Sequence, residues 1–86
     1  MSEASPLRVH LQAGDVLFRE GDAPTTGFLV ERGELEIATT IHGRAIVLSH
    51  LRAGDLLGEM AVFDGEPRSA TATAVSDCVL FPIDRT

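Results

Sequence analysis

The sequence predicts an all-β domain of the jelly-roll type, a barrel of about eight short strands. Three observations predict it: glycines that recur roughly every seven to twelve residues, short apolar runs between them, and a seven-residue segment that occurs twice. Short strands at that spacing, separated by turn signals, are typical of β-sandwiches and barrels. The 86 residues are enough for one domain with a modest core.

Candidate strands follow the turns along the chain. Apolar runs at 16–18, 27–30, 35–37, 45–48 and 78–81 are expected to form them. The alternation of charged and apolar residues at 34–37 predicts a half-buried strand with its charges outward. Residues 59–63, barely more than one turn, are the best candidate for a helix. We expect residues 1–6 to be a loose tail and residues 7–86 to form the domain.

The repeated segment begins at Leu11 and again at Leu51, and five of its seven positions are identical. Its centre is Ala-Gly-Asp, a common β-turn sequence in which glycine supplies a positive φ and aspartate binds nearby backbone. One explanation is that such turns recur by chance. The other is a jelly roll of two halves with equivalent corners, and the matching leucines on both sides of the turn favour it.

Composition excludes several classes of function. The net charge is -6 and no basic run occurs, which argues against a nucleic-acid partner. No apolar run approaches the ~18 residues of a membrane span, so no membrane partner is expected. The N-terminus does not resemble a signal peptide. The single cysteine, Cys78, is expected to be a small core residue in a reducing compartment, and the protein is expected to be cytoplasmic.

Enzymatic motifs are missing from the sequence. The histidines His10, His42 and His50 do not form a pair at metal-binding spacing, which counts against a cupin-like metal enzyme, a remote alternative. No Gly-x-Ser-x-Gly nucleophile motif and no glycine-rich nucleotide loop is present. We therefore predict a protein without catalytic activity, metal or cofactor.

Residues 57–71 combine the features of an anion site. Gly58 would let a ligand approach the backbone closely. Amides that open the expected turn at 59–63 would point outward without partners. Arg68 would add a forked, permanently charged donor, and Ser69 would add a hydroxyl.

Glu59 narrows the choice of ligand, because a carboxylate beside an anion would repel it. Glu59 would be favourable if the ligand also has hydroxyl groups that donate to its carboxylate, as a ribose next to a phosphate does. The alternative is structural: Glu59 and Arg68 pair with each other, and Gly58 serves a bulge. From the residues alone, both explanations stay open.

Together, residues 57–71 resemble the phosphate-binding cassette of the cyclic nucleotide-binding domain family. That family includes the catabolite activator protein, regulatory subunits of cyclic nucleotide-dependent kinases, and gated ion channels. Residues 14–22 resemble its first hairpin, residues 27–35 its next two strands, and residues 47–55 the strand and corner that enter the cassette. The resemblance covers about residues 11–84.

The resemblance implies a ligand site for a cyclic nucleotide. Arg68 would contact the cyclic phosphate and Glu59 the ribose 2′-hydroxyl. The other implied contacts are cassette backbone from Gly58, Met60 and Ala61, a hydroxyl from Ser69 to phosphate or base, and apolar side chains beside the base from Ile37 and Leu48. Ser69 leans towards cyclic AMP over cyclic GMP without deciding between them.

The implied function is regulatory: a bacterial module that senses cyclic AMP or cyclic GMP for an output domain outside this chain. The main alternative is a barrel that keeps the cassette residues but serves as a structural or protein-interaction domain. The family's flanking helices are missing from these 86 residues, which stop about where the first C-terminal helix would start. The apolar surface left uncovered would invite self-association into a homodimer.

Overall fold

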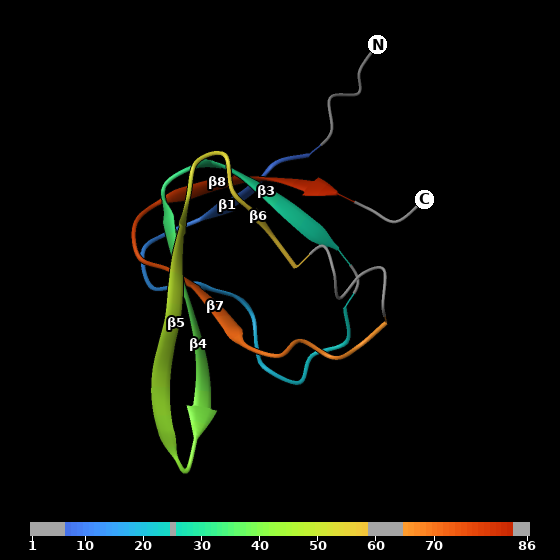
Figure 1. Cartoon of the computed structure of the whole chain (residues 1–86). Helices are drawn as coiled ribbons and strands as arrows, with labels where there is room; N and C mark the ends of the chain where they lie inside the picture. The colour runs from blue at the N-terminus through green and yellow to red at the C-terminus, as the bar shows by residue number, and fades with distance from the viewer. Residues whose placement is uncertain (1–6, 25, 59–64, 84–86) are drawn as a thin grey trace.

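The computed structural model describes residues 7–24, 26–58 and 65–83, which form eight strands in two antiparallel sheets (Figure 1). One sheet contains, in spatial order, β1 (Val9–Leu11), β8 (Cys78–Ile83), β3 (Gly27–Arg32) and β6 (Leu56–Leu57). The other contains β2 (Val16–Phe18), β7 (Thr71–Ala74), β4 (Glu34–Ile41) and β5 (Arg44–Arg52). The all-β prediction is confirmed.

The structure does not test the helix expected at 59–63 or the tail expected at 1–6. The described part of the chain contains no helix. The helical turn predicted at 59–63 and the loose tail predicted at 1–6 lie outside the described residues.

The core is formed by apolar side chains from both sheets. Its buried members are Phe28, Val30, Leu35, Leu57, Ala72, Ala74, Cys78 and Leu80. Cys78, only 2% exposed, is a core residue as predicted. Its Sγ donates to the carbonyl oxygens of Glu34 and Ser76, at 3.3 and 3.2 Å. Burial raises the pKa of the Cys78 thiol, which keeps the side chain neutral inside the core.

The alternation at 34–37 forms the predicted half-buried strand with its charges outward. Leu35 is fully buried, whereas Glu34 and Glu36 point to the outer face, where both lie near the His50 ring. The Glu34 Oε2–His50 Nδ1 distance is 3.7 Å and the Glu36 Oε1–His50 Nε2 distance is 3.8 Å. A strand with one face in the core and one in water produces this pattern.

The two copies of the repeat form equivalent corners. Gly14 and Gly54 have φ values of 94° and 97°, which glycine adopts without strain. In each corner the aspartate carboxylate accepts the amide three residues before it: Asp15 from Gln12 at 2.8 Å, and Asp55 from Arg52 at 2.9 Å. The first corner leads from β1 to β2 and the second from β5 to β6, so each carries the chain from one sheet to the other. This agrees with the prediction of equivalent corners in two halves.

A third turn of the same design follows β2. Gly21 has a φ of 92°, and the Asp22 carboxylate accepts the Arg19 amide at 2.9 Å. The sequence repeat does not include this turn, because it shares only the Gly-Asp pair with the first corner and Arg-x-Gly-Asp with the second, and lacks the flanking leucines.

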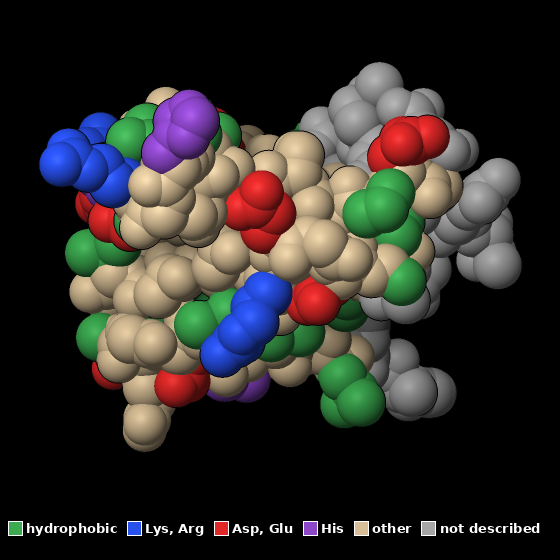
Figure 2. Space-filling view, turned by 90° about the horizontal axis from the view of Figure 1, so that it is seen from below, with side chains coloured by type: hydrophobic (Ala, Val, Ile, Leu, Met, Phe, Trp, Pro, Cys, Tyr) green, Lys and Arg blue, Asp and Glu red, His purple; other side chains and the backbone are tan. Residues whose placement is uncertain are grey.

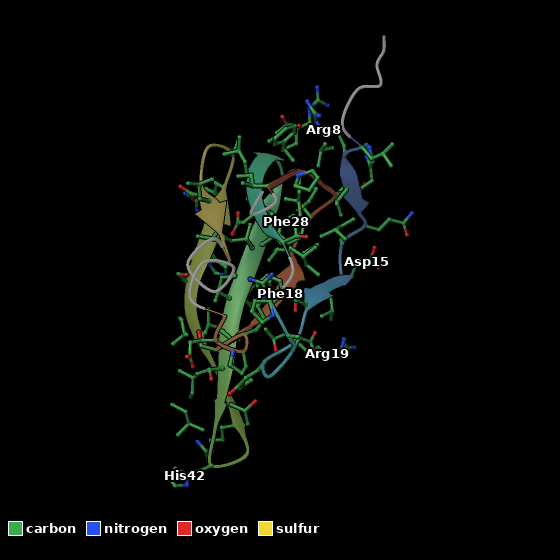
Figure 3. All side chains as sticks on the ribbon, turned by 90° about the vertical axis from the view of Figure 1, so that its right-hand side faces the viewer. Arg8, Asp15, Phe18, Arg19, Phe28 and His42 are labelled. Carbon is green, nitrogen blue, oxygen red and sulfur yellow. The ribbon has the colours of Figure 1, made fainter. Side chains whose placement is uncertain are left out.

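Strands β4 and β5 form a long hairpin that extends away from the rest of the domain (Figure 1). Its tip is His42-Gly43, and His42 lies at the far end of the molecule (Figure 3). The pairing register shifts between Ile37 and Ala38, where β5 contains one extra residue. This bulge decides which residues of β5 lie opposite which residues of β4.

Candidate functional site

A cavity of about 240 Å³ lies where β6 ends and where the chain leads into β7. Its lining comes from both sheets: Phe18, Ile37, Ser49, Leu51, Leu56, Leu57, Gly58, Arg68, Ser69 and Ala70. The wall is mostly apolar, with two serine hydroxyls and one arginine among its side chains. Such a pocket, apolar with a few polar groups, is typical of small-molecule sites.

Arg68 is the buried cation of this cavity, with 5% of the residue exposed. Its Nη1 donates to the Gly58 carbonyl oxygen at 2.9 Å, and its Nη2 donates to the Thr26 carbonyl oxygen. The guanidinium carbon lies 4.2 Å from the centre of the Phe18 ring. Among the described residues, the Arg68 Nε has no hydrogen-bond partner.

Arg68 carries its positive charge in a buried position. Burial lowers the pKa of the guanidinium, and the Asp22 carboxylate acts in the opposite direction. An arginine nevertheless stays protonated near neutral pH. No carboxylate of the described residues lies within ion-pair distance of it. A buried positive charge held by carbonyl oxygens, with one donor unused, is suited to receive an anion.

Gly58 makes close contact with Arg68 possible. It has a φ of 74°, and a Cβ at this position would collide with the Arg68 guanidinium. The sequence predicts that Gly58 lets a ligand approach the backbone closely. In the structure it admits the arginine side chain, and its contact with a ligand stays a prediction.

The structure brings four of the predicted site residues to one cavity: Ile37, Gly58, Arg68 and Ser69. Glu59, Met60 and Ala61 lie outside the described residues, so their predicted roles, and the alternative pairing of Glu59 with Arg68, stay predictions.

Leu48 is not brought to the cavity. It is 57% exposed, and its neighbour Ser49 lines the cavity instead. The reason is the bulge in β5: Ile37 lies opposite Ser49 and Ala38 opposite Val47, which leaves Leu48 as the extra residue. Its placement gives no support to the predicted position beside a base.

Several lining residues were missed by sequence reasoning, and Phe18 is the most important of them. Phe18 and Arg68 are 50 residues apart in the chain, and β2 and β7 bring them together. In Figure 3, Phe18 lies inside the molecule whereas its neighbour Arg19 points outward. The run at 16–18 predicted a strand, but nothing in it indicated an aromatic face for an arginine.

Outside the cavity, the described residues show fewer features of a functional site. They contain no group of three metal-ligating side chains, and no helix among them is long and apolar enough to cross a membrane. On the face seen in Figure 2, arginine and acidic side chains lie scattered among apolar and uncharged ones. That face therefore has no continuous basic surface in the described part of the chain.

Comparison with known proteins identifies the family. The model of the cyclic nucleotide-binding domain matches residues 8–86. The chain belongs to the cyclic nucleotide-binding domain family. The predicted family is thus confirmed, and with it the jelly-roll fold.

The proteins that this chain resembles are of several kinds. The chain is 34% identical over 77 residues to human Rap guanine nucleotide exchange factor 3, covering 88% of this chain and 8% of the relative. It is 36% identical over 67 residues to the cAMP-dependent protein kinase regulatory subunit of Eremothecium gossypii, covering 78% and 14%. The cAMP-bound EAL enzyme Bd1971 is structurally similar, with a TM-score of 0.87, 32% identity, and coverage of 91% and 21%. The chain thus spans a small part of each relative's length.

Proposed function

We propose that this chain binds a 3′,5′-cyclic nucleotide, cyclic AMP or cyclic GMP, in the Arg68 cavity and regulates an output domain in response. The observation that carries the proposal is the buried Arg68 guanidinium, which faces an apolar cavity and has an unused donor and no carboxylate partner among the described residues. Membership of the cyclic nucleotide-binding domain family supports it. So do the cAMP-bound and cGMP-bound forms of the similar EAL enzyme Bd1971.

The cyclic phosphate would replace the neutral carbonyl acceptors of Arg68 with a charged acceptor. The two Nη groups now donate to neutral carbonyl oxygens of Gly58 and Thr26. A phosphate is a charged acceptor, so it adds an ion pair to the hydrogen bonds of the guanidinium and can accept two of its N–H groups at once. The Nε, which has no partner among the described residues, would be a further donor. An anion would therefore be a stronger acceptor for Arg68 than the two neutral carbonyl oxygens.

The rest of the nucleotide would be held by residues on both sides of the phosphate. We assign the ribose 2′-hydroxyl to Glu59, backbone contacts to Gly58, Met60 and Ala61, and a hydroxyl contact to Ser69. The apolar wall around Ile37, Leu51 and Leu57 suits the flat face of a purine.

This function needs no catalysis and no cofactor, since a sensor releases its nucleotide unchanged. We place the protein in the cytoplasm, where cyclic nucleotides act as signals. We also propose that the protein forms a homodimer. Strand β5 exposes apolar side chains that a second copy would cover, namely Ile46, Val47 and Leu48.

Calorimetric titration with cyclic AMP, cyclic GMP and linear 5′-AMP tests the function. We expect saturable binding of at least one cyclic nucleotide. Arg68→Leu should reduce its affinity by about 10- to 150-fold, the loss of 1.5–3 kcal/mol that a charged hydrogen bond contributes.

Arg52→Leu is the matched control for this test. It removes the same charge from a side chain that is 75% exposed, and whose pairing with Glu34 lies on the outer face. Its affinity should equal that of the wild-type protein. If a folded wild-type protein binds neither cyclic nucleotide, the structural or protein-interaction barrel is the correct alternative.

A further inference from the structure

Two turns of the same design hold the two ends of one segment, residues 68–74. At one end, the Gly14 amide donates to the Ala74 carbonyl oxygen and the Ala74 amide donates to the Asp15 carbonyl oxygen, both at 2.8 Å. At the other end, the Gly21 amide donates to the Arg68 carbonyl oxygen at 2.7 Å, and the Arg68 amide donates to the Asp22 carbonyl oxygen at 2.8 Å. The second turn therefore holds the residue whose side chain forms the site.

The Asp22 carboxylate closes this second turn. It accepts the Arg19 amide at 2.9 Å, while the Asp22 amide donates to the Arg19 carbonyl oxygen at 3.0 Å. A turn that is closed by both backbone and side chain presents its Gly21 amide and Asp22 carbonyl oxygen in a fixed direction. Those are the two groups that bind the Arg68 backbone.

Glu20 connects the same turn to β4 and β7. Its amide donates to the Thr71 Oγ1 at 3.0 Å, and its carboxylate accepts the Thr40 amide at 3.1 Å. These bonds do not involve Asp22, so they keep the loop attached to both strands when the Asp22 carboxylate is removed. We therefore expect a change at Asp22 to act on the end of the turn that holds Arg68 and to leave the fold intact.

We propose that Asp22 is a positioning residue of the nucleotide site: by closing the turn at 19–22 it fixes the Arg68 backbone, and with it the place of the guanidinium in the cavity. The inference rests on the proposed contact between Arg68 and the cyclic phosphate. When the turn opens, a smaller fraction of molecules has Arg68 in the binding position, and the apparent dissociation constant rises as that fraction falls.

The chain provides its own control for this inference. Asp15→Ala and Asp22→Ala each remove one negative charge and one side-chain bond to the amide three residues earlier. Each turn holds one end of the same segment, but only the turn of Asp22 holds Arg68. Asp22→Asn keeps an oxygen acceptor for the Arg19 amide and removes the charge, so it separates the hydrogen bond from the charge.

Nucleotide affinity is the first measurement, made by titration with cyclic AMP and cyclic GMP well below the unfolding temperature of every variant. We expect Asp22→Ala to weaken binding by about 2- to 10-fold, the equivalent of one lost hydrogen bond. Asp15→Ala should bind like the wild-type protein, and Asp22→Asn should bind at least as tightly, because it keeps the turn closed and removes a negative charge that acts on Arg68. Equal losses in Asp15→Ala and Asp22→Ala would overturn the proposal, and so would a loss in Asp22→Asn as large as in Asp22→Ala.

Amide hydrogen exchange without nucleotide is the second measurement, and it separates this inference from the proposed function. The Arg68 and Gly21 amides should exchange faster in Asp22→Ala, and the Ala74 and Gly14 amides faster in Asp15→Ala. If the wild-type protein binds no cyclic nucleotide but this exchange pattern appears, the proposed function fails while the hold of Asp22 on Arg68 stands. If Arg68 exchanges equally in both variants, Asp22 does not position it.

Discussion

The ring of Phe18 lies against the guanidinium of Arg68, with 4.2 Å between the guanidinium carbon and the ring centre. In the described part of the chain this aromatic face, and not a carboxylate, accompanies the buried cation. An aromatic face stabilises a positive charge without neutralising it. Arg68 therefore keeps its charge for an incoming anion while its place in the cavity is fixed.

Replacing the ring tests this relationship. Phe18→Leu should weaken nucleotide binding by about 2- to 30-fold, because a desolvated cation–π contact contributes roughly 0.5–2 kcal/mol. Titration with cyclic AMP and cyclic GMP measures the change. Phe81→Leu is the matched control, since the Phe81 ring lies 4.7 Å from the guanidinium carbon of Arg8, a residue that does not line the cavity. Equal losses in the two variants would contradict the role given to Phe18.

Gly58 should tolerate no side chain. Gly58→Ala imposes a strained positive φ, at a cost of about 1–3 kcal/mol, and also places a Cβ against the Arg68 guanidinium. We expect both a lower free energy of unfolding, measured by urea denaturation, and a large loss of nucleotide affinity.

Gly14→Ala is the control that separates the two effects of Gly58→Ala, the strain of a positive φ and the collision with Arg68. Gly14 has a φ of 94° and open space where a Cβ would be. The control should therefore lose stability from strain and keep its affinity. If Gly58→Ala binds as tightly as Gly14→Ala, the contact between Gly58 and Arg68 has no part in binding.

The free energy of unfolding should fall at alkaline pH because of Cys78. Burial raises the pKa of this thiol above its ordinary value of 9.0, so above about pH 9 the unfolded chain loses the proton while the folded chain retains it. The folded state then binds more protons than the unfolded state, and stability falls as pH rises. The sequence has no lysine and no tyrosine, so no other side chain titrates in this range below the arginines.

Urea denaturation of the wild-type protein and Cys78→Ala between pH 8 and pH 10.5 measures this effect. The wild-type free energy of unfolding should decline above about pH 9, by at most roughly 1.4 kcal/mol per pH unit. The variant should be less stable at pH 8 and show no such decline. An equal decline in both proteins would show that Cys78 is not its cause.

The fold could be predicted from the sequence because its signals are local. Glycine and aspartate specify the corners at Gly14 and Gly54, and the alternation around Leu35 specifies a strand with one buried face. The turn at 19–22 was not recognised as a third equivalent corner, since its similarity lies mainly in hydrogen bonds and the leucines that flank the other two corners are absent.

The site could be predicted in part. Gly58, Arg68 and Ser69 belong to one short segment, and the pattern within that segment was sufficient to select them. Ser49 lines the cavity and was not predicted, whereas Leu48, the extra residue at the β5 bulge, does not line it, and bulges have no clear sequence signal. Phe18 was missed because its contact with Arg68 exists only through the pairing of β2 and β7.

The central claim is that Arg68 donates hydrogen bonds to the cyclic phosphate. The most direct measurement is NMR of the Arg68 guanidinium during titration with cyclic AMP or cyclic GMP, with detection of scalar coupling from its N–H groups to phosphorus. We predict that the Arg68 signals shift in proportion to bound nucleotide, and that coupling to phosphorus appears at saturation. A saturated complex in which the Arg68 signals stay in place, with no coupling to phosphorus, would contradict the claim.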